Sequence, residues 1–262
     1  MPTCRPILSC LAVAIAFCIP HGARAEPLRL AVAANFAGTA QILADAYTAR
    51  GGERPTVSSG SSGQLATQIT QGAPFDLFLS ADAERPRDLV AQGLADPASR
   101  TTYAIGQLVL WQPDGAAPPH AAPLGAATLA ANGFTRLAIC NPQTAPYGAA
   151  SIQALHALGV YDTVSNKLVV ANSVAQALQF ARSGNAELAF VALAQVHDGH
   201  GGAYWLVPQK LYAPIVQDAV VLSHAPHPGE AHAFMTFLQG PQARKLIEAA
   251  GYVVPATAGT AP

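Results

Sequence analysis

Apolar runs that suit strands alternate along this chain with segments whose apolar residues recur at helical spacing. The run from Leu28 to Ala33 precedes a segment that places Phe36, Leu43 and Tyr47 on one helical stripe. Further strand-like runs cover residues 75–79, 108–111, 137–139, 168–170 and 188–191, with helical patterns near 82–92, 148–158 and 174–183. A strand that is apolar throughout is buried on both faces, so the alternation predicts parallel-rich sheets with helices on both faces. The predicted fold class is therefore α/β.

The last third of the chain has a different order of elements. A strand-like run covers residues 213–222, and two helical patterns follow at 229–239 and 241–250. Gly240-Pro241 separates these patterns, and proline is well placed at the first position of a helix. We therefore expect one more strand followed by two helices.

The N-terminus has the three parts of a secretory signal. Arg5 precedes an apolar run from Ile7 to Ile19, and Ala23-Arg24-Ala25 forms a small-x-small cleavage site. The prediction is a signal peptide over residues 1–25 that is cleaved after Ala25, which places the mature protein in the periplasm.

Charge and cysteine content narrow the class of the exported protein. The full chain has 14 Lys+Arg and 15 Asp+Glu, and loss of Arg5 and Arg24 leaves 12 basic residues (14 minus 2) and a charge of -3. No basic footprint for nucleic acid is therefore available. Cys140 is the one cysteine of the mature chain, so an internal disulfide is excluded, and its apolar neighbours favour a core position over a nucleophilic role.

A hydroxyl-rich segment predicts a site for an anion. Ser58-Ser59-Gly60-Ser61-Ser62-Gly63-Gln64 leads directly into a short helical pattern over residues 65–69. The start of a helix gathers unpaired N–H groups and the positive end of the helix dipole, so it attracts anions without Lys or Arg. Ordinary N-capping explains one such serine, but these hydroxyls exceed what one cap needs.

The same order of strand, small polar residues and helix recurs at three other places. These are Asn35, Tyr147 and Ser173-Val174. In open α/β sheets, ligands lie beyond the carboxyl ends of the strands, where such turns converge. The residues alone therefore predict a site for a small oxyanion, without naming the anion.

Several segments together carry a resemblance to a known family. They are AVAANF at 31–36, SS at 61–62, GAPFDLFLSAD at 72–82, NPQTAPYG at 141–148, ANSVAQAL at 171–178 and FLQGPQA at 237–243. In sequence and order they resemble the periplasmic molybdate-binding proteins of ABC transporters, the ModA family. The resemblance covers nearly all of the mature chain, and the segment at 72–82 is the most specific part of it.

The resemblance implies a fold and a division into lobes. The implied fold is the two-lobe, type II periplasmic binding protein, with the ligand in the cleft between the lobes. The first lobe is expected to combine residues 26–106 with 214–262, and the second to comprise residues 107–213. The lobes are expected to close on the ligand, because the ligand touches both of them only in the closed form.

The resemblance also implies a ligand and its binding residues. Molybdate, and tungstate with it, is the implied ligand. The oxyanion-binding positions carry over to Asn35, Ser62, Tyr147 and Val174, with Ala34 as a further backbone donor. Asn35 is expected to give its backbone N–H and its amide, Ser62 its hydroxyl and N–H, and the other two their backbone N–H groups. No resident cofactor or cation is implied, since molybdenum is bound only as the oxyanion.

Two positions depart from patterns seen in the family. Some members carry a tyrosine where this chain has Ala192, so that contact is absent here. Others have a threonine before the asparagine, where this chain has Ala34. The chain resembles this second type without its threonine hydroxyl, and the missing hydroxyl weakens the expected site.

The implied binding residues agree with the chemistry of a dianion. None of them is charged, so N–H dipoles in a dry cleft must neutralise the ligand. A site made only of donors leaves the proton of hydrogen phosphate without an acceptor. Sulfate has no such proton, and its shorter bonds are expected to place its oxygens out of reach of the donors.

Other functions remain open at this point. The serine segment does not fit the G-x-S-x-G elbow of hydrolases, so the protein is not expected to be an enzyme. A metal-binding protein would use loop histidines and nearby carboxylates, namely His197, Asp198, His200, His224, His227, Glu230 and His232. No ligand spacing known for metal sites links these residues, which favours ordinary surface histidines. A third alternative keeps the fold but binds sulfate, another oxyanion or a small organic acid.

The expected partner is the membrane permease of an ABC transporter, and the protein itself is expected to be a monomer. No sequence feature marks the surface that would contact the permease.

Overall fold

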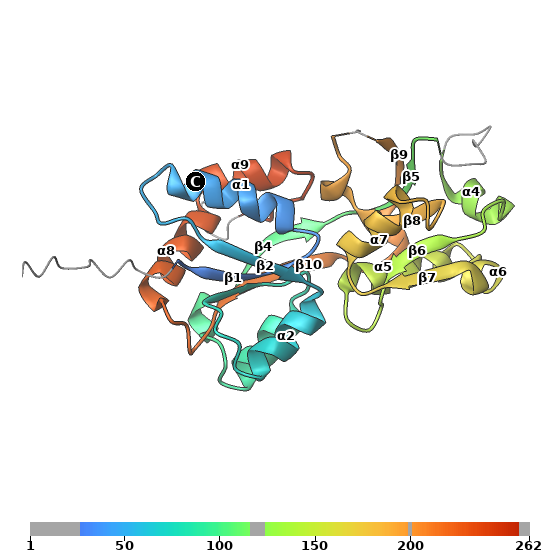
Figure 1. The fold of residues 1–262 in the computed structure, drawn as a ribbon. Helices are drawn as coiled ribbons and strands as arrows, with labels where there is room; N and C mark the ends of the chain where they lie inside the picture. The colour runs from blue at the N-terminus through green and yellow to red at the C-terminus, as the bar shows by residue number, and fades with distance from the viewer. Residues whose placement is uncertain (1–26, 116–123, 199–200, 257–262) are drawn as a thin grey trace, which may run out of the picture.

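The structure, a computed structural model, describes residues 27–115, 124–198 and 201–256. They form two lobes, each built on a five-stranded mixed sheet with helices around it (Figure 1). The predicted signal peptide, its cleavage site after Ala25 and His200 lie outside the described residues. Within the described part of the chain, no helix has the length and apolar character needed to cross a membrane.

The sheet of the first lobe has the strand order β2-β1-β3-β10-β4. These strands are β1 (Arg29–Ala33), β2 (Thr56–Gly60), β3 (Leu77–Leu79), β4 (Thr101–Gly106) and β10 (Ile215–Val221). β1 is parallel to β2 and β3, whereas β10 is antiparallel to β3 and β4. The predicted parallel core is therefore present, and the late strand enters it in the opposite direction.

Helices cover both faces of the first sheet (Figure 1). One face packs against α1 (Ala37–Thr48), α8 (Pro228–Gln239) and α9 (Pro241–Ala249), and the other against α2 (Ser62–Thr70) and α3 (Glu84–Ala91). Alternate residues of a strand point to opposite faces, so Leu30 and Val32 join the first core and Ala31 joins the second. This double burial explains why the strands are apolar throughout.

The second lobe repeats this plan with the strand order β7-β6-β8-β5-β9. Its strands are β5 (Leu108–Pro113), β6 (Leu137–Cys140), β7 (Leu168–Ala171), β8 (Leu188–Ala192) and β9 (Gly202–Leu206). β6 is parallel to β7 and β8, and β5 is antiparallel to β8 and β9. Its helices are α4 (Ala126–Ala131), α5 (Pro146–Ala157), α6 (Tyr161–Val164) and α7 (Val174–Arg182), of which α5 and α7 contact β6 and β8.

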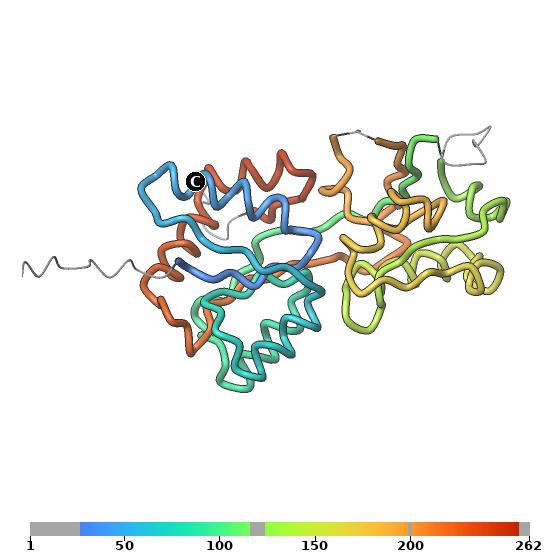
Figure 2. Tube along the Cα trace, viewed as in Figure 1, coloured from blue at the N-terminus to red at the C-terminus, as the bar shows by residue number. Residues whose placement is uncertain are grey.

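The chain passes between the lobes twice, as the trace in Figure 2 shows. Only Gln107 separates the end of β4 from the start of β5. The return path runs through residues 207–214, which include the short 3-10 helix η4 (Gln209–Leu211), and continues into β10. Further 3-10 turns are η1 (Pro97–Ser99), η2 (Ser165–Lys167) and η3 (Leu193–Gln195).

Most expected elements are present, and the α/β class and two-lobe fold are confirmed. The expectation for Ser58 and Ser59 is wrong, because both lie in β2 and are exposed rather than in the turn before α2. β2, β4, β9, α4 and α6 were not expected from the sequence. β2 and β9 are edge strands with exposed or half-buried side chains, so they lack the apolar run that signals a buried strand.

Candidate anion-binding site

A small cavity lies between the lobes, at the ends of the parallel strands. Every site residue predicted from the sequence lines it. The lining is Ala33, Ala34, Asn35, Gly60, Ser61, Ser62 and Ala81 from the first lobe, and Ala145, Pro146, Tyr147 and Val174 from the second. No side chain in this lining is charged, so any ligand charge must be met by dipoles.

Helix starts bring the predicted residues to the cavity. Ser61 caps α2 and forms a capping box with Gln64, which makes Ser62 the first helical residue. Ser173 caps α7 in a similar way by accepting from the N–H of Gln176, and Val174 is the first residue of that helix. The positive ends of both helix dipoles therefore point into the cavity.

α5 also begins at the cavity. Pro146 is its first residue, a position where the missing N–H of proline costs no helical hydrogen bond, and Tyr147 follows it. α1 begins at Ala37, two residues after Asn35, and the turn between them is closed by a bond from the N–H of Phe36 to the carbonyl of Ala33. The starts of four helices thus surround one small space.

Four buried backbone N–H groups have no hydrogen-bond partner among the described residues. They belong to Asn35, Ser62, Tyr147 and Val174, whose exposed fractions are 4%, 1%, 1% and 4%. Buried N–H groups in folded proteins are almost always paired, so a cluster of unpaired ones around a cavity points to an acceptor-rich ligand. Two of these donors come from each lobe.

The hydroxyl of Ser62 is oriented by the neighbouring loop. Its Oγ accepts a hydrogen bond from the N–H of Ala81 at 2.9 Å. Because that bond occupies a lone pair, the hydroxyl hydrogen is free to be donated elsewhere. Ser62 therefore offers two donors, its hydroxyl and its N–H.

Ala34 differs from the other predicted residues. Its backbone N–H donates to the carbonyl of Gly60 at 2.9 Å, which continues the pairing between β1 and β2 beyond their last residues. This donor is therefore already used inside the protein. Ala34 lines the cavity but has no backbone N–H left for a ligand.

The side-chain amide of Asn35 has no hydrogen left to donate to a ligand. Its Nδ2 donates to Oε1 of Gln217 at 3.0 Å and to the hydroxyl of Tyr252 at 3.2 Å, so both hydrogens are used. The Tyr252 hydroxyl in turn donates to the carbonyl of Asn35 at 2.8 Å. The backbone N–H is the donor that Asn35 has left.

Gln217 links the two lobes next to the cavity. Its Oε1 also accepts from the hydroxyl of Tyr103 at 3.0 Å, and its Nε2 donates to the hydroxyl of Tyr147 at 3.4 Å. Burial raises the pKa of Tyr103, Tyr147 and Tyr252, so these phenols stay neutral and add no negative charge near the cavity. Sequence reasoning did not identify Gln217, although a polar pair, Gln217-Asp218, stood out within the strand-like run at 213–222.

The loop histidines that the structure describes have separate partners. His197 Nδ1 lies 3.2 Å from the carbonyl of Ala194, and His227 contacts the buried carboxylate of Asp76 with both its N–H and its ring. His232 lies 3.8 Å from Asp96. The described residues contain no group of three His, Cys, Asp or Glu side chains that could hold a metal ion.

Comparisons with known proteins identify the family. The model for bacterial extracellular solute-binding proteins matches residues 28–253. The chain belongs to this family. It is 44% identical over 251 residues to the molybdate-binding protein ModA of Rhodobacter capsulatus, covering 96% of this chain and 97% of the relative. It is 44% identical over 249 residues to ModA of Azotobacter vinelandii, covering 94% and 97%.

A solved structure shares the fold at a similar level of identity. The periplasmic molybdate-binding protein of Azotobacter vinelandii superposes with a TM-score of 0.82 at 44% identity, covering 87% of this chain and all of that one. The resemblance to the ModA family found in the sequence is thereby confirmed, and these family members are binding proteins rather than enzymes.

Proposed function

We propose that this protein captures molybdate in the periplasm and delivers it to the permease of an ABC transporter. The observation that carries the proposal is the set of four unpaired N–H groups, two from each lobe, around one uncharged cavity. Two relatives that are 44% identical to this chain are molybdate-binding proteins, which supports the choice of anion.

The donors we assign to the anion are the backbone N–H groups of Asn35, Ser62, Tyr147 and Val174, together with the Ser62 hydroxyl. Ala34 is left out because its N–H is bonded to Gly60, and the amide of Asn35 because its hydrogens are bonded elsewhere. A tetrahedral dianion has enough lone pairs to accept from all of these donors at once. Helix starts and a dry surrounding make each such bond stronger than it is in water.

Selectivity follows from the same donors. Hydrogen phosphate carries a proton that finds no acceptor in the cavity, which leaves a buried donor unpaired. Sulfate is smaller than molybdate, so its oxygens cannot reach donors from both lobes simultaneously. Tungstate is nearly isosteric with molybdate, and we propose that it binds equally well.

We propose that the two lobes act as rigid halves, comprising residues 26–106 with 214–262 and residues 107–213. The anion bridges donors on both halves, so it stabilises the closed arrangement over any open one. The mature protein, exported after cleavage at Ala25, acts as a monomer in this proposal. It presents both halves to the permease when it is closed.

Calorimetric titration of residues 26–262 tests the proposal. Molybdate and tungstate are expected to bind tightly at one site, whereas sulfate and phosphate give no heat of binding. Tight binding of sulfate without a heat of binding for molybdate would contradict the choice of anion and leave the fold assignment unchanged. Stoichiometric zinc in the gently purified protein would instead support the metal-binding alternative.

A further inference from the structure

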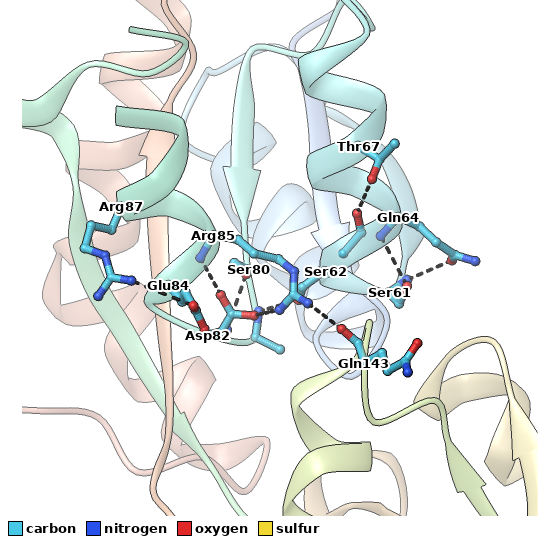
Figure 3. Close-up of polar contacts among 12 residues, drawn as sticks. Ser61, Ser62, Gln64, Thr67, Ser80, Asp82, Glu84, Arg85, Arg87 and Gln143 are labelled. Atoms are coloured by element: carbon cyan, nitrogen blue, oxygen red, sulfur yellow. Dashed lines mark hydrogen bonds and ion pairs between the residues drawn. The ribbon is translucent and has the colours of Figure 1, made fainter. Parts of the chain in front are cut away.

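A loop of the second lobe lies against the first lobe just outside the cavity. The N–H of Gly63, the second residue of α2, donates to the carbonyl of Thr144 at 2.9 Å. Nη2 of Arg85, the second residue of α3, donates to the carbonyl of the preceding residue, Gln143, at 3.0 Å. Figure 3 shows the Arg85 side chain reaching across to this loop. Two consecutive carbonyls of one lobe are thus held by two donors of the other.

Gly63 makes the close approach of the two lobes possible. A Cβ built at this position would lie 3.1 Å from Cα, Cβ and the carbonyl oxygen of Thr144. Two of these three atoms are backbone, so a side chain at position 63 would push the loop away. Glycine at position 63 therefore allows the first lobe to contact Thr144 of the second lobe.

Arg85 is held in position before it reaches the second lobe. Nη1 forms an ion pair with Oδ2 of Asp82, and the other oxygen of that carboxylate accepts from the backbone N–H of Arg85 at 2.9 Å. The Arg85 side chain is only 23% exposed. Because the guanidinium is already ordered by Asp82, its bond to Gln143 costs little further conformational entropy.

None of these contacts involves the cavity lining. Gly63, Arg85, Gln143 and Thr144 are all absent from the residues that surround the proposed anion. They join the lobes directly, so their energy differs between the closed form and a form in which the lobes have separated.

We propose that Gly63 and Arg85, with the carbonyls of Thr144 and Gln143, form a latch that holds the lobes closed and so raises the affinity for the anion. The inference rests on the proposed capture function. The apparent affinity of a ligand that binds the closed form is proportional to the fraction of closed protein, so contacts that never touch the anion tighten its binding. Arg85 and Gly63 are positioning residues in this sense.

Two arginines on α3 provide a matched test. Arg85→Met removes the contact to Gln143, and Arg87→Met removes the same charge from the same helix. Among the described residues, the ion pairs of the Arg87 side chain are to Glu84 and Asp88 of its own helix, and this side chain is 63% exposed. Molybdate affinity is expected to fall about tenfold in R85M, the range for a partly exposed hydrogen bond to a charged group, and to stay within about twofold in R87M.

The mechanism predicts which rate constant changes. The latch slows the reopening of the closed form, with or without the anion, so the loss in R85M is expected mainly as faster dissociation in stopped-flow displacement, with the association rate nearly shared by both variants. Arg85→Lys retains a donor without the forked geometry and is expected to recover part of the affinity. Equal affinities in R85M and R87M would overturn the latch and point to simple electrostatic attraction.

A measurement without any anion separates the latch from the proposed function. Spin labels on cysteines at Ile42 and Val170, which are 50% and 55% exposed, report the distance between the lobes. Cys140 is fully buried and does not compete for the label. Anion-free R85M is expected to show a larger share of long distances than wild type and R87M. Identical distance distributions in the three proteins would overturn the latch. Absence of molybdate binding in the titration, with the distances changed as expected, would overturn only the proposed function.

Discussion

The hydroxyl of Ser62 is the side-chain donor that we assign to the anion, and its removal is a direct test of the site. Its Oγ accepts from the N–H of Ala81, which leaves its hydrogen for the anion. Ser62→Ala is expected to weaken molybdate binding by about 1–3 kcal/mol, since a buried anion loses a donor. Titration calorimetry measures the loss. Ser59→Ala is the control, because Ser59 is exposed in β2, and unchanged affinity in the Ser62 variant would remove its hydroxyl from the site.

The side-chain amide of Gln217 connects three residues around the cavity. It is fully buried, and its side chain bonds Asn35, Tyr103 and Tyr147. Gln217→Leu leaves three buried polar groups short of a partner, so we expect a loss of about 2–4 kcal/mol in the free energy of unfolding. Tyr147→Phe removes only the bond of 3.4 Å and is expected to cost about 1 kcal/mol or less.

Urea unfolding of both variants, with molybdate titration beside it, measures these effects. Affinity is expected to fall further in Gln217→Leu than in Tyr147→Phe, because the amide positions Asn35 as well as Tyr147. A Gln217→Leu protein as stable as wild type would show that the network contributes nothing to the fold.

The sequence could predict which residues line the cavity but not the residues that position them. Helix starts are local patterns, and the family resemblance singled out Ser62 and Val174 among them. Gln217 acts through partners that lie 182, 114 and 70 residues away along the chain, so no local pattern reveals its role. The amide of Asn35 was expected at the ligand, and only the folded structure shows that its hydrogens are already bonded to Gln217 and Tyr252.

At the scale of elements, the start of α5 must pack closely on β6 to place Tyr147. A Cβ built at Gly148 would lie 2.2 Å from the carbonyl oxygen of Cys140 and 2.8 Å from the carbonyl carbon of Asn141. Gly148→Ala is therefore expected to move α5 away from the strand. We expect a loss of about 2 kcal/mol or more in stability, in the range of overpacked cores, together with weaker binding.

Gly38 in α1 provides the matched control for that change. A Cβ at Gly38 meets nothing within 4 Å, so Gly38→Ala is expected to leave stability unchanged or to raise it by up to about 1 kcal/mol. Thermal and urea unfolding of the two alanine variants give the comparison. Equal stabilities would contradict the close packing of α5 on β6.

Strands that are buried on both faces were predictable, whereas of the four edge strands β2, β4, β7 and β9 only β7 was expected from the sequence. Leu77–Leu79 is buried at every position, and such a run signals a strand by itself. Thr56–Gly60 is exposed or half-buried throughout, so its serines suggested a turn when they in fact pair with β1. The reason is physical, since an edge strand is specified by its hydrogen bonds to a neighbour and not by its own burial.

At the scale of the whole molecule, two kinds of contact join the lobes. The chain itself crosses near Gln107 and through residues 207–214, close to the buried amide of Gln217. The contacts of Gly63 and Arg85 lie outside the cavity, on the loop that leads into α5. The proposed anion lies between these two sets of contacts, so its affinity depends on both as well as on its own donors.

Alkaline pH is expected to destabilise the whole molecule, because its buried acids cannot ionise in the folded state. Burial raises the pKa of the Cys140 thiol from 9.0 to about 12, and it raises the pKa of Tyr103 and Tyr147 well above their usual 10.0. In the unfolded chain these groups lose their protons near their ordinary values. Unfolding therefore releases protons above about pH 9, and stability falls as the pH rises from there towards 12.

Urea midpoints measured from pH 8 to pH 11 test this expectation. Each such group contributes a loss of about 1.4 kcal/mol per pH unit above its unfolded pKa. Cys140→Ala removes one of these groups and is expected to make the decline shallower between pH 9 and 10, where the phenols contribute least. The native thiol should also resist a thiol reagent at pH 8 and react only after urea is added. A flat profile, or fast labelling of the folded protein, would contradict the burial of Cys140 in the core of the second lobe.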